Sequence, residues 1–258
     1  MTLEVLQKAG VTAMLLAAVV ATSSQRLARA ESKPASPVIF YASQSGRSTL
    51  DQGEGGGNPF ASALIEVLER PSLTYAEFRT DLIALTKEKS RGFQEPDAST
   101  SIDSTQWRVK PISASAKRVA LVFVYSNYGN TGVTSLPGAK RDLVRVAAAL
   151  KSAGFDVQVA IDPTQNDLRV ALDTLSRRSQ NAEAAIIYLT GHGFEHRGQV
   201  YLMPNDYPFG EGSERLSELA VHVPSLVHYL KARSANLVLF GGCRTYMRGT
   251  NPLQVPGV

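Results

Sequence analysis

Apolar residues in the second half of the chain form short runs that alternate with stretches of helical periodicity. The runs at 118–125 (RVALVFVY), 184–190 (AAIIYLT) and 235–242 (ANLVLFGG) are nearly unbroken, as expected for strands that are covered on both faces. The segment 155–161 (FDVQVAI) alternates between apolar and polar residues, which predicts a strand nearer the sheet edge. These strands and the segments between them predict an α/β fold with a doubly wound, parallel sheet.

Helices are predicted in the intervals between these strands. The segment 138–152 has helical spacing and is followed by Gly154, in the position where helices commonly end. Thr164 is the predicted N-cap of the next helix, whose leucines recur at i, i+4 and i+7. Pro224 opens a short helix before the last strand.

The first part of the chain has a different rhythm. A strand is predicted at 37–43 (PVIFYAS), followed by a flexible glycine-rich loop at 51–58 (DQGEGGGN). Asn58 is the predicted N-cap of a helix that runs to about Arg70. The sequence TYAE at 74–77 is a capping box that starts a second helix.

An edge strand is predicted at 104–109 (STQWRV), and the Ser-, Ala- and Pro-rich segment 110–117 is the predicted linker to the second part. Two strands and two helices are too few to fold as an independent domain. We therefore expect residues 31–109 to join the sheet of residues 118–258, so that 31–258 fold as one domain.

The first thirty residues resemble a signal peptide. Lys8 precedes an apolar run at 11–21, and the small-x-small sequence ARA at 28–30 stands before Glu31. This predicts export to the periplasm or the medium. The apolar run is short for a membrane span, so no stable anchor is expected once the leader is removed. An uncleaved anchor or an ordinary amphipathic leader is the alternative.

Composition narrows the class of protein. The chain has 258 residues, of which 43% are hydrophobic and 19% charged, which is compatible with a large folded core. The net charge of +4 is partly due to the leader, and no stripe of Lys and Arg is interleaved with aromatic residues. Nucleic-acid binding is therefore not expected. The single cysteine excludes an intramolecular disulfide.

Two strand ends carry candidate chemistry. His192 stands between two glycines just after the strand at 184–190, and Cys243 stands just after the last strand. In a parallel sheet both lie at the carboxyl edge, where α/β sheets bind their ligands. An imidazole beside a thiol creates a thiolate nucleophile, and the N–H groups of Gly193 and Cys243 are the natural oxyanion donors.

Structural roles are the alternative for both residues. A cysteine after an apolar strand is often a small buried hydrophobe, and a histidine in a glycine turn is often a structural donor. One cysteine and four scattered histidines do not make a closed zinc site, so no metal and no cofactor are expected.

Longer segments resemble a known family. The segments ALVFVYSNYGNTGVTSLPGAKRDLVRVAAALKSAGFDV, YLTGHGFEHRGQVYLMPND and LVLFGGCR resemble the large-subunit half of the caspase-like cysteine peptidases, especially bacterial members of the metacaspase type. The earlier segments FYASQSGRSTLDQGEGGGNPFASALIEVL, TYAEFRTDL and RGFQEP resemble the small-subunit half, which normally follows the cysteine. The resemblance implies a caspase-like fold with a mostly parallel six-stranded sheet and helices on both faces. It also implies a circular permutation, in which a small-subunit-like half at 31–109 precedes a large-subunit-like half at 118–258. The rival explanation is that the halves pair between chains, or that the gene is a rearranged remnant.

The resemblance also implies roles for single residues. His192 is the general base, Cys243 is the nucleophile and Gly193 belongs to the oxyanion hole, in an endopeptidase that cuts after Arg or Lys. Gly241 stands where the family has an acid that helps to hold the basic P1 side chain, which weakens the expected preference. Asp142 matches a second acid of the same pocket, and its alternative role is a first-turn acid favoured by the helix dipole.

The expected partner is a peptide or protein substrate. A monomer is expected, with a swapped dimer as the alternative. Calcium, which activates some metacaspases, has no recognisable ligand cluster in the sequence. The rival function is a catalytically weak homologue that uses the same cleft to bind a peptide or a partner protein.

Overall fold

The central sheet of the protein has six strands. The structure is a computed structural model that describes residues 34–98, 108–110, 115–211 and 213–246. The sheet order is β3-β1-β11-β7-β5-β6. Its strands are β1 (Val38–Tyr41), β3 (Asp97–Ala98), β5 (Arg118–Val124), β6 (Asp156–Ile161), β7 (Ala184–Thr190) and β11 (Ala235–Phe240). Five strands are parallel and β3 runs antiparallel to β1. The expected six-stranded, mostly parallel sheet is therefore present.

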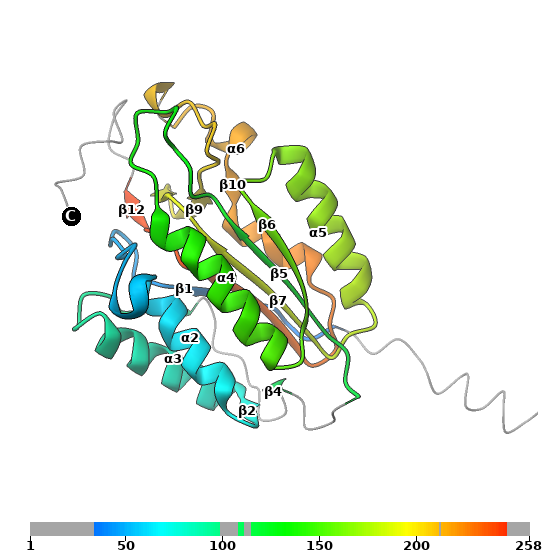
Figure 1. Cartoon of the computed structure of the whole chain (residues 1–258). Helices are drawn as coiled ribbons and strands as arrows, with labels where there is room; N and C mark the ends of the chain where they lie inside the picture. Colours follow the sequence, from blue (N-terminus) through cyan, green and yellow to red (C-terminus); the bar gives the residue numbers. More distant parts are fainter. Residues whose placement is uncertain (1–33, 99–107, 111–114, 212, 247–258) are drawn as a thin grey trace, which may run out of the picture. The chain divides into compact units, whose positions relative to one another are not determined.

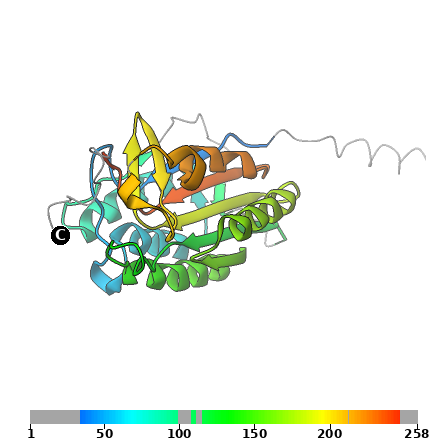
Figure 2. The same ribbon diagram turned by 90° about the horizontal axis from the view of Figure 1, so that it is seen from above.

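Helices cover both faces of this sheet (Figure 1). The helical elements are α2 (Pro59–Glu69), α3 (Tyr75–Lys89), α4 (Pro137–Ser152), α5 (Gln165–Ser179), the short α6 (Leu216–Leu219) and the 3-10 helices η1 (Glu54–Gly56), η2 (Phe209–Glu211) and η3 (Val223–Tyr229). The core on one face includes α2, α3 and α4, and the core on the other includes α5 and η3. Figure 2 shows the sheet between these layers.

Successive residues of β5 alternate between the two cores. Leu121 packs on the α5 side and Val122 on the α4 side, because side chains of a strand point to opposite faces. This double burial explains the unbroken apolar runs. The edge strand β6 is half exposed, as its alternating pattern predicts.

The predicted helix boundaries are confirmed. The side chain of Asn58 accepts a hydrogen bond from the first turn of α2, and Thr164 does the same for α5. Thr74 and Glu77 form the capping box of α3. Gly154 follows α4 with φ of 85°, a conformation that glycine adopts without strain.

Two small sheets flank the main one. A four-stranded sheet has the order β10-β9-β8-β12 and contains β8 (Gly193–His196), β9 (Gln199–Leu202), β10 (Val221–His222) and β12 (Thr245–Tyr246). A two-stranded sheet pairs β2 (Leu73–Thr74) with β4 (Arg108–Lys110). Along the chain, the β8–β9 hairpin comes directly after β7 and before the segment that leads to β11.

The prediction of an edge strand at 104–109 needs correction. Residues 104–107 lie outside the described residues, and the described part, β4, pairs with β2 rather than with the main sheet. The edge strand beside β1 is β3, whose two residues, Asp97 and Ala98, carry no alternation that a sequence pattern could reveal.

The first part of the chain joins the sheet of the second, as predicted, because β1 pairs in parallel with β11. The predicted leader at 1–30 lies outside the described residues, as do positions 111–114 of the predicted linker. Within the described ranges, no helix combines the length and the apolar character that a membrane crossing requires. The described residues from 34 to 246 cluster as one unit. The loops after β1, β5, β7 and β11 therefore converge at one edge of the sheet.

Candidate active site

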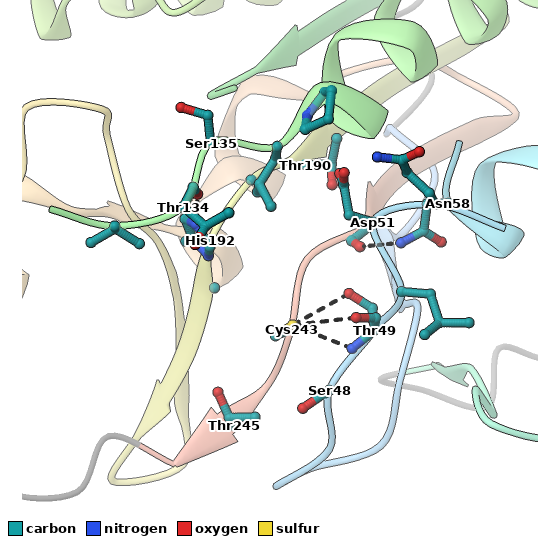
Figure 3. Close-up of a pocket in the computed structure, with 18 of the residues that line it drawn as sticks. Ser48, Thr49, Asp51, Asn58, Thr134, Ser135, Thr190, His192, Cys243 and Thr245 are labelled. Carbon is teal, nitrogen blue, oxygen red and sulfur yellow. Dashed lines mark hydrogen bonds between the residues drawn. The ribbon is translucent and has the colours of Figure 1, made fainter. Parts of the chain in front are cut away.

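A cavity of about 720 Å³ opens at this carboxyl edge (Figure 3). Its wall is formed by the segments that follow the four strands β1, β5, β7 and β11. Side chains on the wall include Thr49, Asp51, Thr190, His192 and Cys243. The chain leaves β5 toward β6 on one side, while β7 lies on the other side of β5. Ligand sites of open α/β sheets form at such a switch point.

His192 is held in place by a backbone that tolerates no side chain on either neighbour. A Cβ atom on Gly191 would lie 2.7 Å from Leu202 Cδ1 and 2.9 Å from Tyr128 Oη, and one on Gly193 would overlap the carbonyl oxygen of Cys243. The close approach explains why glycine flanks the histidine on both sides. It also shows that the backbones at Gly193 and Cys243 are in contact.

The imidazole of His192 has a defined proton position. Its Nε2 lies 2.7 Å from the carbonyl oxygen of Thr134, and a carbonyl only accepts, so Nε2 carries the hydrogen. Nδ1 is then the proton acceptor of the neutral ring. Tyr128 packs edge-on against the ring with centroids 4.5 Å apart, and its hydroxyl accepts from the His192 backbone N–H at 3.1 Å.

Burial lowers the pKa of His192 below its ordinary value of 6.5. The hydrogen bond to Thr134 and the charge of Asp51 act in the opposite direction but do not overcome the burial. The ring is therefore neutral near pH 7, the form in which a histidine accepts a proton.

The thiol of Cys243 is partly exposed and lies against Thr49. The Thr49 backbone N–H donates to Sγ at 3.2 Å, and the Thr49 hydroxyl lies 3.4 Å from it. An N–H donor stabilises negative charge on sulfur. Figure 3 shows Cys243 with these bonds to Thr49, and His192 on another part of the wall. The structure thus brings the predicted base and nucleophile to one cavity.

The two residues proposed for substrate binding lie in different places. Gly241 lines the cavity, and its carbonyl accepts from Asn58 Nδ2 at 3.0 Å. Asp142 is fully buried and is not among the side chains that form the wall. Its Oδ2 accepts from the Asn58 backbone N–H at 3.0 Å, and its Oδ1 lies 3.6 Å from Arg145 Nη1. Asn58 therefore stands between Asp142 and the Gly241 backbone.

The sequence reading did not single out three cavity-lining residues that the structure shows: Thr49, Asp51 and Thr134. The carboxylate of Asp51 accepts from the N–H groups of Gly138 at 2.9 Å and Ala139 at 3.1 Å, in the first turn of α4. Asp51 belongs to the segment 51–58, which was predicted only as a flexible loop. One signal could have identified Asp51. It is an acidic residue in the loop after the predicted strand at 37–43, and loops at this edge of the sheet commonly carry functional residues.

A charged cluster around the buried Arg244 lies next to Cys243. Arg244 is 8% exposed and bonds to Glu195 Oε2 at 3.1 Å and to Asp97 Oδ2 at 2.9 Å. Its guanidinium also lies 4.2 Å from the ring centroid of Tyr41. Arg244 therefore connects the loop after β11 to β8, which follows His192, and to the two strands β1 and β3.

An imidazole and a thiol on one cavity wall are the groups that a cysteine-dependent hydrolase uses. The caspase domain family matches residues 117–253, just over half of the chain, and this segment contains both groups. The chain belongs to the caspase domain family. It is a cysteine peptidase-like protein, with proteins or peptides as its class of substrate. No protein with a curated description matches it significantly.

Replacing Arg244 by Met is expected to lower the free energy of unfolding by about 3–5 kcal/mol, because Glu195 keeps its hydrogen bond from Ser45 but is left as a buried charge without a counter-charge. Urea unfolding at pH 7 measures the change. The matched control is Arg215→Met, which removes an exposed ion pair with Glu218 and should cost less than about 1 kcal/mol. The double variant with Glu195→Gln should recover part of the loss. Equal midpoints for the two single variants would contradict the assignment.

The buried carboxyl of Asp142 should make stability depend on pH. Burial raises its pKa from 3.8 to about 7, so the unfolded chain releases this proton at a lower pH than the folded one. Stability is therefore lost as the pH rises from about 4 to about 7. Asp142→Asn removes that loss, and the variant should gain up to about 4 kcal/mol relative to the parent across this range. A difference between the two proteins that stays constant with pH, in urea unfolding, would refute the buried ionisation.

Proposed function

We propose that the protein is a cysteine endopeptidase in which Cys243 is the nucleophile and His192 the general base. The observation that carries the proposal is the bond from His192 Nε2 to the Thr134 carbonyl, at 2.7 Å. It leaves Nδ1 free to take a proton in the cavity that also holds the thiol.

The chemistry follows from these groups. Nδ1 of His192 takes the thiol proton, and the thiolate sulfur forms a bond to the carbonyl carbon of the substrate. The oxyanion accepts hydrogen bonds from the N–H groups of Gly193 and Cys243. The imidazolium then gives its proton to the leaving amine as the C–N bond breaks. Water, activated by the same imidazole, hydrolyses the thioester and restores the thiol.

The proposed substrates carry Arg or Lys at P1, as in peptidases of the metacaspase type. Asp51 is the one carboxylate among the described residues of the wall, and no Lys or Arg lies beside it there. A cationic side chain therefore meets a favourable charge, and an acidic one meets repulsion. Gly241 supplies no acid of its own, so the preference is shallower than with two acids on the wall.

We also propose that the chain is a circular permutant. Counted from β5, the sheet order becomes 2-1-3-4-5-6, in which the fourth, fifth and sixth strands each lie beside their predecessor. Counted from β1, the chain connects β3, at one edge of the sheet, to β5, which lies beside the opposite edge strand β6. The order from β5 is the simpler path, which supports an ancestral chain that began there. In this reading 31–109 is the small-subunit-like half, and export by residues 1–30 remains a proposal.

Cys243→Ala should abolish hydrolysis of a peptide substrate, and His192→Ala should lower kcat/KM by at least ~10²-fold, the low end for a general base. Initial rates with a fluorogenic peptide measure both. His228→Ala is the matched control, since His228 lies on η3 and not on the cavity wall, and it should keep parental activity.

Labelling with a peptidyl electrophile separates the peptidase from its rival. The parent should gain one label at Cys243 and turn over substrate. A chain that binds the peptide tightly but neither reacts nor turns over would instead be a peptide-binding homologue. Parental activity in Cys243→Ala or His192→Ala would refute the mechanism.

The acid limb of kcat/KM should have its midpoint below pH 6.5. The reason is that burial lowers the pKa of His192, and the ring must be neutral to accept the thiol proton. A pH series with an uncharged substrate measures it. A midpoint above 6.5 would mean that another group, or a charged imidazole, controls this limb.

A further inference from the structure

The negative charge of the cavity wall is concentrated at one residue. Asp51 contributes the carboxylate, and the other described side chains of the wall are neutral or apolar, apart from the imidazole of His192. Figure 3 shows Asp51 and Asn58 across the view from His192. A ligand that reaches from the dyad to this side of the cavity therefore meets Asp51.

Asp51 is held in a fixed position. Each of its two oxygens accepts one N–H from the start of α4, from Gly138 and Ala139. A carboxylate has about four acceptor positions, so two remain for a further donor. A guanidinium offers donors in a planar fork that matches such a carboxylate, and a lysine ammonium offers a compact charge.

Asp142, the acid suggested by family resemblance, is less accessible. Its Oδ2 already accepts from Asn58, and Arg145 lies beside Oδ1 as a counter-charge. The backbone of Gly57 packs directly on the carboxylate, because a Cβ atom there would overlap Oδ1. A P1 side chain reaches Asp142 only if Gly57 and Asn58 move.

We propose that Asp51 is the specificity-determining residue that recognises the P1 cation, and that Asp142 positions Asn58 and the loop at 51–58 from behind. The inference rests on the peptidase function proposed above. It assigns the recognition of the P1 charge to the loop after β1, near the start of the described chain, whereas the proposed nucleophile lies near its end.

A matched pair of peptides that differ only in Arg or citrulline at P1 tests the proposal, because citrulline keeps the shape and removes the charge. The parent should prefer Arg in kcat/KM by about tenfold or more, the effect of one bond to a charged group. Asp51→Asn should bring the ratio close to one by slowing the Arg peptide and not the citrulline peptide. Asp173→Asn, which changes a partly exposed acid of α5 away from the cavity wall, is the matched control and should leave the ratio unchanged.

Asp51→Ser provides a second variant, since serine keeps an acceptor for the helix N-terminus without the charge. It should lose the preference in the same way. An unchanged ratio in a folded Asp51 variant, or a ratio lost in Asp173→Asn, would overturn the proposal.

Failure of the peptidase function gives a different result. If the parent cleaves neither peptide, the dissociation constants of the same two peptides for Cys243→Ala replace kcat/KM. Tighter binding of the Arg peptide that depends on Asp51 would support the recognition while the catalytic proposal fails. Equal binding of both peptides would refute it.

Discussion

The parallel pairing of β1 with β11 is the interaction on which the rest of the site depends. It joins Val38–Tyr41 to Leu237–Phe240, segments that are almost two hundred residues apart. Both strands are buried on two faces, so their side chains fix the register. The loops that leave their carboxyl ends then have to meet. This places Thr49 against the sulfur of Cys243 and brings Asp51 to the first turn of α4.

Polar contacts at this edge are made between segments rather than within them. Asn58 bonds through its backbone to Asp142 and through its side chain to the Gly241 carbonyl, so that one residue links α2, α4 and the loop that carries Cys243. Arg244 does the same for β8 and β3. Buried charges are costly unless they are paired, so these contacts hold the loops in one arrangement. The proposed dyad and the proposed recognition site therefore share these supporting contacts.

Local signals in the sequence predicted most elements, and tertiary contacts explain what was missed. The strands β5, β7 and β11 were predicted because strands that are buried on both faces have apolar residues at nearly every position. Capping residues such as Asn58 and Thr164 marked the starts of helices. The helix α4 has no cap from its own N-cap residue, because Asp51 supplies the acceptors from 87 positions earlier. The carbonyl of Thr134 is a backbone group, which no pattern of side chains identifies as the partner of His192. Cys243 and His192 were singled out because each stands within three residues of the end of a buried strand.

The order of segments has a consequence for how the site is assembled. The segment from β5 to the loop after β11 holds both the imidazole and the thiol, together with Thr134 and Tyr128, and its contacts are comparatively local. The donor to the sulfur, Thr49, comes from a point 194 residues away. Contacts between distant segments require closure of a long loop before they contribute stability. The proposed dyad is therefore encoded in one contiguous stretch. The contacts of its sulfur and the proposed recognition residue Asp51 are in place only when β1 pairs with β11.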